Sequence, residues 1–317
     1  MTRIAVLGEC MIELSHVGER TLTLAYGGDV YNTAVSLARW GRASGTDVAF
    51  VSRLGDEHHS AAMRAAWTAE GLDSTLTDAV PGHAPGLYLI RTDERGERSF
   101  AYWRDASPAR RLLCDDDHAA HVRAGLAGTD WLFLSGITLS LLSDAAHDRL
   151  LGVLDALVAG GTRVAFDTNY RPAGWPDART ARARMHGVLS RAALALPTLD
   201  DEEALHGDAG WRDTLRRLQR LGVDEAAVKL GAEGAVVLAD GAVDHVPAER
   251  DVRVVDTTGA GDAFDAGYLH GRLAGLPPRA AARTGARLAA VVLGHRGAIA
   301  PEDAMPDPPG PVPARAA

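Results

Sequence analysis

The sequence has little of what marks secreted or membrane-spanning proteins. It contains only two cysteines, Cys10 and Cys114, which lie far apart and have no neighbours typical of metal ligands. A disulfide between them stays open, but isolated thiols in a reducing cytoplasm are the favoured interpretation. The N-terminus does not show the pattern of a signal peptide, and no apolar run approaches the roughly 20 residues that span a bilayer. We therefore expect a cytoplasmic protein without a membrane partner.

Positive charge is scarce as well. Lys and Arg together number 33 against 42 Asp and Glu, so the formal net charge is −9. Because no basic tract offsets this balance, nucleic acid is not expected as a partner. Aromatic residues make up only 5% of the chain, whereas hydrophobic residues make up 46%, which suffices for the full core of a globular protein.

Short apolar runs alternate with amphipathic helical stretches along most of the chain. The runs that we expect as strands buried on both faces cover residues 3–8, 47–55, 130–136, 163–169, 193–199 and 226–231. Helices are expected, among others, over 29–40 and 143–160. This alternation predicts the α/β class, with a mostly parallel sheet covered by helices on both sides. Ligands bind such sheets at the carboxyl ends of the strands.

Two segments do not fit a parallel sheet. Residues 9–15 continue the first strand with alternating polarity, and residues 87–104 read as a hairpin whose turn contains Gly96. We predict that they belong to a small separate β-sheet that stands over the strand ends as a lid. This lid is expected to comprise about residues 10–28 and 84–105.

The stretch DTTGAGDAFDAGY, residues 256–268, has an unusual helix start, because Gly259, Ala260 and Gly261 precede a lone carboxylate, Asp262. One interpretation is plain helix capping by Asp262. The other is that the exposed amides at the helix N-terminus hold an anion while the carboxylate acts as a base. A cap needs no platform of small residues, so we favour phosphoryl transfer to an alcohol at this site.

A second glycine-rich start lies at residues 26–41. Gly28 is expected to let the backbone turn or approach a ligand, Asp29 to cap the following helix, and Asn32 to face back from its first turn. These residues suit the hydroxyl groups of a polyol, although on their own a plain capped turn is the favoured explanation.

Aromatic and basic side chains gather on the predicted hairpin. Tyr102 and Arg104 are two residues apart and so share a face, and Tyr88 on the paired strand can lie near them. Two phenols and a guanidinium suit an oxygen-rich, negatively charged small molecule, while the alternative is an ordinary exposed face.

Further polar residues follow two predicted strands at the expected ligand edge. Asn169 and Arg171 come after the strand that ends near residue 167. Lys229 lies late in a buried strand, before a turn framed by Gly231 and Gly234. A buried lysine needs a partner, so it either pairs with an internal carboxylate or reaches a phosphate.

With these residues in view, the sequence resembles the PfkB family of carbohydrate kinases, also called ribokinase-like. The segment DTTGAGDAFDAG resembles the C-terminal signature of that family, and GGDVYNTAVSLAR resembles its N-terminal signature. The resemblance implies a ribokinase-like three-layer α/β/α sandwich with a β-sheet lid. It also implies a kinase domain over 1–306, followed by a proline-rich tail at 307–317 that we expect to fray.

The resemblance also implies roles for the candidate residues. Asp262 would be the catalytic base, with the amides of Gly259, Ala260 and Gly261 as the anion hole. The residues expected to contact the sugar are Gly28, Asp29, Asn32, Tyr88, Tyr102, Arg104, Arg171 and Asp262. The residues expected to line the nucleotide are Asn169, Arg171, Lys229, Gly231, Gly234, Gly259 and Gly261.

ATP and a divalent cation, Mg²⁺, are the cofactors that the resemblance implies. Many relatives carry an Asn-x-x-Glu motif that organises water around magnesium, but this chain has Thr198 and Asp201 in those places. Asp201 is therefore expected to reach the metal only through water. Asp256 and Thr258 resemble a loop that binds a monovalent cation such as K⁺.

Further segments, among them GECMIELS, FDTNYRPAGW and HRGAIAPEDAMP, resemble family members that act on the sugar acid 2-keto-3-deoxygluconate. We expect transfer of the γ-phosphoryl group of ATP to its primary hydroxyl, giving the 6-phosphate. Arg104 and Arg171 would hold the carboxylate, which a neutral sugar lacks. The alternatives are a fructokinase- or ribokinase-like kinase of a neutral sugar and a sugar-acid sensor without catalysis. A homodimer that pairs through the lid is also expected.

Overall fold

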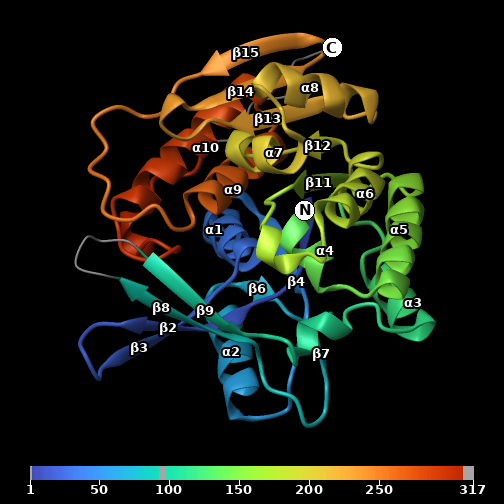
Figure 1. Ribbon diagram of the computed structural model, residues 1–317, viewed down its shortest axis with the longest axis vertical. Coiled ribbons are helices and arrows are strands. Elements are labelled where there is room, and N and C mark those ends of the chain that lie inside the picture. The colour runs from blue at the N-terminus through green and yellow to red at the C-terminus, as the bar shows by residue number, and fades with distance from the viewer. Residues whose placement is uncertain (1, 93–97, 310–317) are drawn as a thin grey trace.

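The computed structural model describes residues 2–92 and 98–309. A nine-stranded sheet lies between two layers of helices, and a smaller four-stranded sheet projects from one side (Figure 1). This arrangement confirms the predicted α/β class, with its three layers and an additional small sheet.

The nine strands follow the spatial order β15-β14-β13-β12-β11-β10-β1-β4-β6. Neighbouring strands pair in parallel except for β13 with β14 and β14 with β15, which are antiparallel. The strands are β1 (Thr2–Leu7), β4 (Thr46–Val51), β6 (Leu72–Asp73), β10 (Trp131–Ser135), β11 (Arg163–Asp167), β12 (Leu194–Ala195), β13 (Glu225–Lys229), β14 (Ala235–Ala239) and β15 (Ala242–Val246).

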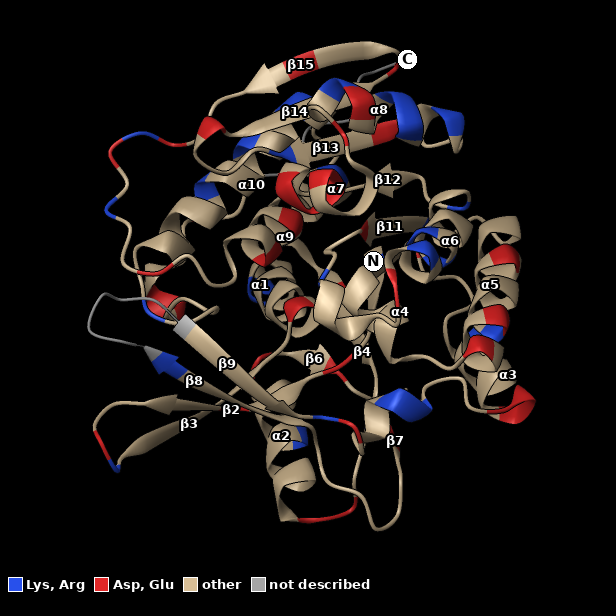
Figure 2. Ribbon diagram, viewed as in Figure 1, with Lys and Arg blue, Asp and Glu red and all other residues tan. Residues whose placement is uncertain are grey.

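Ten α-helices are present in the described residues. They are α1 (Asp29–Ser44), α2 (His58–Ala69), α3 (Asp116–Gly125), α4 (Gly136–Leu141), α5 (Asp144–Ala159), α6 (Ala178–Leu189), α7 (Leu199–His206), α8 (Trp211–Arg220), α9 (Ala260–Leu273) and α10 (Pro278–Leu293). Short 3₁₀ turns cover Pro108–Arg111, Pro172–Gly174, Gly231–Glu233 and Glu302–Ala304. Acidic and basic residues both occur along outer helices such as α5 and α8 (Figure 2).

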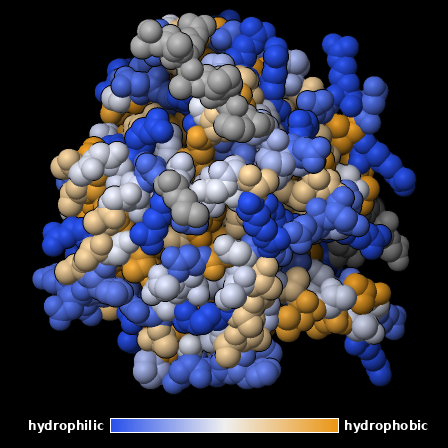
Figure 3. All heavy atoms as spheres, turned by 180° about the vertical axis from the view of Figure 1, so that it is seen from behind, coloured by the Kyte–Doolittle hydropathy of each residue, from blue (hydrophilic) through white to orange (hydrophobic). Residues whose placement is uncertain are grey.

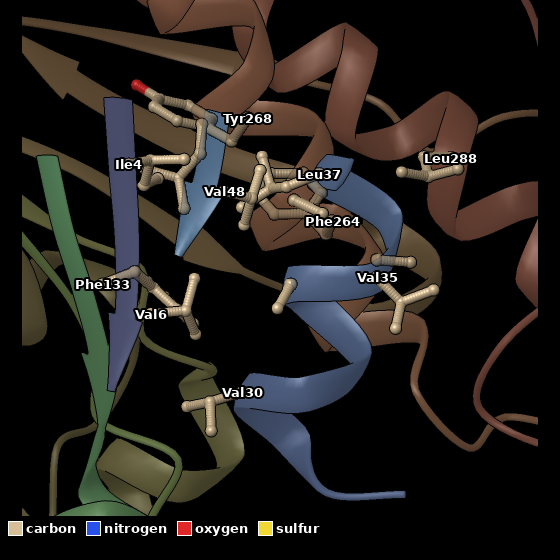
Figure 4. Packing of buried hydrophobic residues seen from close by; sticks show 14 of the residues in the cluster. Ile4, Val6, Val30, Val35, Leu37, Val48, Phe133, Phe264, Tyr268 and Leu288 are labelled. Atoms are coloured by element: carbon tan, nitrogen blue, oxygen red, sulfur yellow. The ribbon is translucent and has the colours of Figure 1, made fainter. Parts of the chain in front are cut away.

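Strand periodicity divides the core into two halves. On β1, Ile4 and Val6 point to one face of the sheet and join a cluster with residues of α1, α9 and α10 (Figure 4). Ala5 and Leu7 point to the other face and join a cluster with α3, α5, α6 and α8. Because successive side chains alternate across a strand, one continuous apolar run supplies both halves.

The smaller sheet has the strand order β3-β2-β8-β9, and β2 pairs in parallel with β8 while the outer pairs are antiparallel. Its strands are β2 (Met11–His16), β3 (Leu22–Gly27), β8 (Leu87–Thr92) and β9 (Arg98–Trp103). Two short strands, β5 (Arg53–Leu54) and β7 (Asp78–Ala79), pair separately. The predicted hairpin turn with Gly96 lies outside the described residues.

The expectation of a frayed tail from residue 307 is wrong at its start. Arg287 donates a hydrogen bond to the carbonyl oxygen of Asp307, and Pro308 is half-buried. Just before it, the indole of Trp40 donates to the carbonyl oxygen of Pro306 over 2.8 Å. These backbone acceptors tie the segment to α1 and α10, which proline content alone did not reveal. The rest of the tail, 310–317, lies outside the described residues.

Two further expectations concern the cysteines and the presence of membrane-spanning helices. Cys10 is buried and Cys114 is exposed, and both are free thiols, as the isolated-thiol interpretation predicts. None of the helices among residues 2–92 and 98–309 has the length and apolar character needed to cross a membrane.

Candidate active site

A cavity of about 1340 Å³ opens at the carboxyl ends of the parallel strands, where the smaller sheet meets the larger one. It brings together every site residue predicted from the sequence except Asp201. These residues are Gly28, Asp29, Asn32, Tyr88, Tyr102, Arg104, Asn169, Arg171, Lys229, Gly231, Gly234, Gly259, Ala260, Gly261 and Asp262.

The N-terminus of α9 faces this cavity without a side-chain cap. Gly259 is its N-cap residue, with a left-handed φ of 75°. A Cβ atom at this position would lie 2.5 Å from the carbonyl oxygen of Ala298, so only glycine fits. Backbone amides in the first helical turn have no acceptor within their helix, and the helix dipole adds positive potential there. The amides around Gly261 are therefore suited to bind an anion.

Asp262 does not cap the helix, so the plain capping interpretation is wrong. Its carboxylate accepts a hydrogen bond of 2.8 Å from the side-chain amide of Asn32 on α1, and Thr33 donates to its backbone carbonyl over 3.2 Å. Burial and the charge of Asp29 raise the pKa of Asp262 to about 7, against the lowering effect of the Asn32 hydrogen bond. The group is thus held in place and exchanges its proton near neutral pH.

Lys229 pairs with internal carboxylates, which was one of the two options that the sequence left open; the other was contact with a phosphate. Its ammonium lies 3.0 Å from Asp167 and 2.9 Å from Asp265, and all three side chains are buried. Burial alone would lower the pKa of Lys229, but the two carboxylates raise it above its usual value. The lysine therefore remains charged beneath the start of α9, where its ammonium is 3.6 Å from the position of a Cβ atom on Gly261.

Asp29 was expected to cap α1, and this expectation is wrong. Gly28 is the N-cap residue, and Asp29 begins the helix without a capping hydrogen bond. Its carboxylate instead accepts 2.9 Å from the side-chain amide of Asn169, a residue with a left-handed φ of 32°. A Cβ atom at Gly28 would lie 2.6 Å from the carbonyl oxygen of Glu9, which explains the glycine.

The two predicted arginines both line the cavity, and each already has an acidic partner. Arg104 pairs with Glu9, and Nη1 of Arg171 lies 2.8 and 2.9 Å from the two carboxylate oxygens of Asp201. Burial raises the pKa of Tyr102, while both guanidinium groups lower it. Both guanidinium groups therefore act electrostatically on the Tyr102 hydroxyl.

Tyr88 lies beside Tyr102 on the paired strand, with ring centroids 5.9 Å apart. The Tyr88 hydroxyl donates a hydrogen bond to the carboxylate of Glu13. A Cβ atom on Gly27 would lie 2.1 Å from this hydroxyl, so β3 needs glycine at its end. The Tyr88 ring is thus fixed by the small sheet.

Residues 2–92 and 98–309 contain no group of three or more His, Cys, Asp or Glu side chains placed to bind a metal directly. Asp201 is held by Arg171 and lies outside the lining of the cavity. Asp256 accepts hydrogen bonds from the amides of Thr258 and Gly297, over 3.0 and 2.6 Å. A divalent ion at this site would accordingly depend on substrate oxygens and water for most of its ligands.

Two charged residues of the site were not predicted from the sequence. Glu9 follows directly after β1 and lines the cavity, so the rule that ligands gather at strand ends could have found it. Asp265 lies three residues after Asp262, on the same side of α9, and helical spacing points to it. An apolar wall formed by Val254, Val255 and neighbouring residues of α10 was also missed.

An open parallel sheet with an uncapped helix start and a carboxylate at its ligand edge is the architecture of ribokinase-like sugar kinases. The chain belongs to the pfkB family carbohydrate kinases, whose family model matches residues 1–305.

Individual relatives agree with this assignment. The chain is 42% identical over 306 residues to a 2-dehydro-3-deoxygluconokinase of Dickeya dadantii, covering 96% of this chain and 98% of the relative. It is 41% identical over 308 residues to the protein of the same name from Escherichia coli K12, covering 96% and 99%.

Solved structures share the fold. A PfkB protein from Polaromonas superposes with a TM-score of 0.82 at 25% identity, covering 95% of this chain and 98% of that one. A putative ribokinase II from E. coli in complex with ATP and Mg²⁺ superposes with a TM-score of 0.81 at 20% identity, covering 94% and 95%.

Proposed function

We propose that the protein transfers the γ-phosphoryl group of ATP to the primary hydroxyl of 2-keto-3-deoxygluconate, forming the 6-phosphate and ADP. The observation that carries this proposal is the uncapped start of α9, with Asp262 held beside it by Asn32. The names of the relatives at about 40% identity support the same substrate.

In this reaction the substrate oxygen attacks the γ-phosphorus, the bond to ADP breaks, and the hydroxyl proton passes to Asp262. With a pKa of about 7, this carboxylate is ionised often enough to accept the proton and basic enough to hold it. The amides of Gly259, Ala260 and Gly261 stabilise the charge on the moving phosphoryl group, as donors aimed at a transition state do.

The sugar acid is expected on the side of the small sheet. Asn32 Oδ1 is buried and has no hydrogen-bond partner among the described residues, so a substrate hydroxyl can donate to it. Asp29, beside Gly28, is a second acceptor. Arg104 and Arg171, near the Tyr102 hydroxyl, offer charge-assisted hydrogen bonds to the carboxylate.

The nucleotide is expected on the side of α10, where Val254 and Val255 form an apolar wall for a flat base. The turn between β13 and β14 also lines the cavity. Its glycines, Gly231 and Gly234, both adopt positive φ. Asn169, Arg171 and Lys229 would line the phosphates, with Lys229 acting through its charge since its ammonium is already paired.

The residues present fit Mg²⁺ that arrives with ATP, since a carboxylate-lined cavity favours a cation, while residues 2–92 and 98–309 build no direct cage for it. Such an ion polarises the phosphoryl oxygens. Asp201 would touch it through water. We also place a monovalent cation such as K⁺ at the loop of Asp256 and Thr258.

Two further parts of the proposal concern the setting of the enzyme. We place the reaction in the cytoplasm, in line with the free thiols of Cys10 and Cys114. We also propose that two copies pair through the small sheet. Its outer face carries exposed apolar side chains, among them Leu22, Leu24 and Trp103.

A substrate panel tests the proposed function. Purified protein is incubated with Mg-ATP and 2-keto-3-deoxygluconate, fructose or ribose, and ADP release is measured. We expect kcat/KM for the sugar acid to exceed that for either neutral sugar by at least 100-fold. A higher value for fructose or ribose would favour the neutral-sugar kinase, and binding of the acid without ADP release would favour the sensor.

A further inference from the structure

Glu9 is a buried carboxylate whose role follows from where it lies. It comes directly after β1 of the large sheet, is 4% exposed, and lines the cavity. Its Oε2 atom accepts a hydrogen bond from Nη2 of Arg104, which comes directly after β9 of the small sheet. One ion pair thus joins the two sheets at the edge where the substrate is expected.

The surroundings leave this pair little freedom. A Cβ atom on Gly86 would lie 3.1 Å from Glu9 Oε1 and 3.2 Å from Arg104 Cβ. The other carboxylate oxygen, Oε1, is buried and has no hydrogen-bond partner among the described residues. The backbone carbonyl of Glu9 lies close to Gly28, so Glu9 also contacts the start of α1. A side chain packed this closely fixes the direction of whatever it binds.

Arg104 has nitrogen donors to spare. Glu9 occupies Nη2 only, and Nη1 has no hydrogen-bond partner in the part of the chain that the structure describes. The side chain keeps 20% of its surface exposed and lines the cavity. A guanidinium that is anchored through one nitrogen presents the other in a defined direction.

We propose that Glu9 is a positioning residue, which holds the guanidinium of Arg104 against the cavity wall so that it meets the carboxylate of the sugar acid. This inference rests on the proposed function, because it takes the ligand of Arg104 to be a sugar carboxylate. Glu9 itself takes no part in phosphoryl transfer. Its loss therefore weakens acid binding and leaves the chemical step almost unchanged.

A double-mutant cycle tests the proposal with Glu9→Ala, Arg104→Ala and the double variant. We expect Glu9→Ala to raise KM for 2-keto-3-deoxygluconate at least tenfold, with kcat and KM for ATP within twofold of wild type. In the Arg104→Ala background, Glu9→Ala should change KM for the sugar acid by less than twofold. An unchanged or lower KM in the single variant, or a full tenfold effect in both backgrounds, overturns the proposal.

Glu70→Ala is the matched control, because Glu70 pairs with Arg39 over 2.7 Å outside the cavity. Its KM for the sugar acid should stay within twofold of wild type. If Glu9→Ala does not fold, Glu9→Gln keeps the side-chain volume and should raise KM at least threefold, and an unchanged KM there also contradicts the role.

Thermal unfolding without ligand separates this inference from the proposed function. Arg104→Ala leaves the buried Glu9 carboxylate without its cation, so adding Glu9→Ala should raise the melting temperature of that variant. If the wild type fails to phosphorylate the sugar acid while this rescue is observed, the proposed substrate is wrong and the pair stands. If the rescue is absent while the wild type is active, the pair is wrong and the substrate stands.

Discussion

Asp262 lies among charges of both signs, and their balance decides how it works. Burial and the carboxylates of Asp29 and Asp167 favour its protonated form, whereas Asn32 and Lys229 favour the ionised form. The net result is a pKa of about 7, where a general base is most effective at physiological pH. An ordinary surface aspartate, with a pKa near 3.9, would release the proton too readily.

The pH dependence of the reaction follows from this value. Only ionised Asp262 can accept a proton, so kcat/KM should fall about tenfold per unit as the pH drops below 7 and level off above it. Asp29→Asn removes a charge that raises the pKa of Asp262. The midpoint of that variant should therefore move to lower pH, whatever its maximal rate. Rate profiles between pH 5 and 9 measure both, and coincident midpoints would argue against Asp262 as the base.

Replacing the base, Asp262, should lower kcat but not the affinity for the sugar acid. Asp262→Asn keeps the size of the side chain and the contact with Asn32 but cannot accept a proton, so kcat should fall by roughly 10²- to 10⁴-fold. The affinity for the sugar acid, measured by calorimetry, should change less than threefold. A variant that keeps more than half of the wild-type kcat would exclude the assignment.

The same substitution should stabilise the fold at alkaline pH. Because the pKa of Asp262 is raised in the folded state, ionising it costs folding free energy above pH 7, and this cost vanishes as the pH falls towards the unfolded value near 4. Asp262→Asn should therefore be more stable than wild type by about 1–2 kcal/mol at pH 8, with the difference shrinking by pH 5. Denaturant melts at the two pH values give the comparison, and a variant less stable at pH 8 would contradict the sign.

Single residues were predictable where their position in the chain implied their position in the fold. Asn169 and Arg171 follow the parallel strand β11, Lys229 is the last residue of β13, and such strand ends meet at one edge. Their partners were not predictable, because the contact of Asn32 with Asp262 spans 230 positions of sequence. The expected cap at Asp29 failed for a related reason, since Asn169, in the loop after β11, donates a hydrogen bond to its carboxylate.

At the scale of elements, the start of α9 depends on Gly259 more than on Gly261. Alanine at residue 259 combines an unfavourable φ with a clash against the backbone of Ala298, and should cost about 2–4 kcal/mol of stability. The displaced amides should lower kcat at least 100-fold. Urea melts and ADP-release assays of Gly259→Ala measure the two losses.

Two matched variants separate the causes. Gly261→Ala adds a methyl group to the same loop at an ordinary φ, with its nearest neighbour 3.6 Å away, and should keep wild-type stability. Gly45→Ala, at the end of α1, has a φ of 70° and open space, so it should lose only about 1 kcal/mol. Equal stability of Gly259→Ala and wild type would show that the clash is relieved and that the loop is not rigid.

Elements were predicted well where one apolar period extended over a whole strand, as in β1, β4, β10 and β11. The parallel pairing of β2 with β8 was not predicted, since a separation of 75 residues leaves no local signal. The docked segment around Pro306 was missed because its contacts are backbone carbonyls, which the side-chain pattern does not encode.

At the scale of the molecule, charge sets a requirement on binding. The formal net charge is −9, and the three cations that line the cavity, Arg104, Arg171 and Lys229, already pair with carboxylates. Two anionic substrates entering such a site need counter-charge from solution, and a metal ion bound with the nucleotide would supply it. The formal net charge alone does not reveal this requirement, whereas the pairing of these cations with carboxylates does.

The proposed dimer is also a whole-molecule property. The cross-strand register places Leu24, Leu14 and Leu89 in one row on the outer face of the small sheet. This sheet carries hydrophobic surface in the view from behind (Figure 3). Light scattering should give a dimer for the wild type and a monomer for Leu24→Asp. Val243, on β15, is as exposed as Leu24, so the variant Val243→Asp should remain dimeric. A monomeric wild type would rule out this interface.

The most direct test is a crystal structure of the complex with a non-hydrolysable ATP analogue, Mg²⁺ and 2-keto-3-deoxygluconate. We predict a carboxylate oxygen of Asp262 about 2.6–3.2 Å from the primary hydroxyl oxygen of the sugar acid. The γ-phosphate should contact the amides of residues 259–261. A sugar bound with that hydroxyl turned away from Asp262, or phosphates that do not touch the start of α9, would contradict the account.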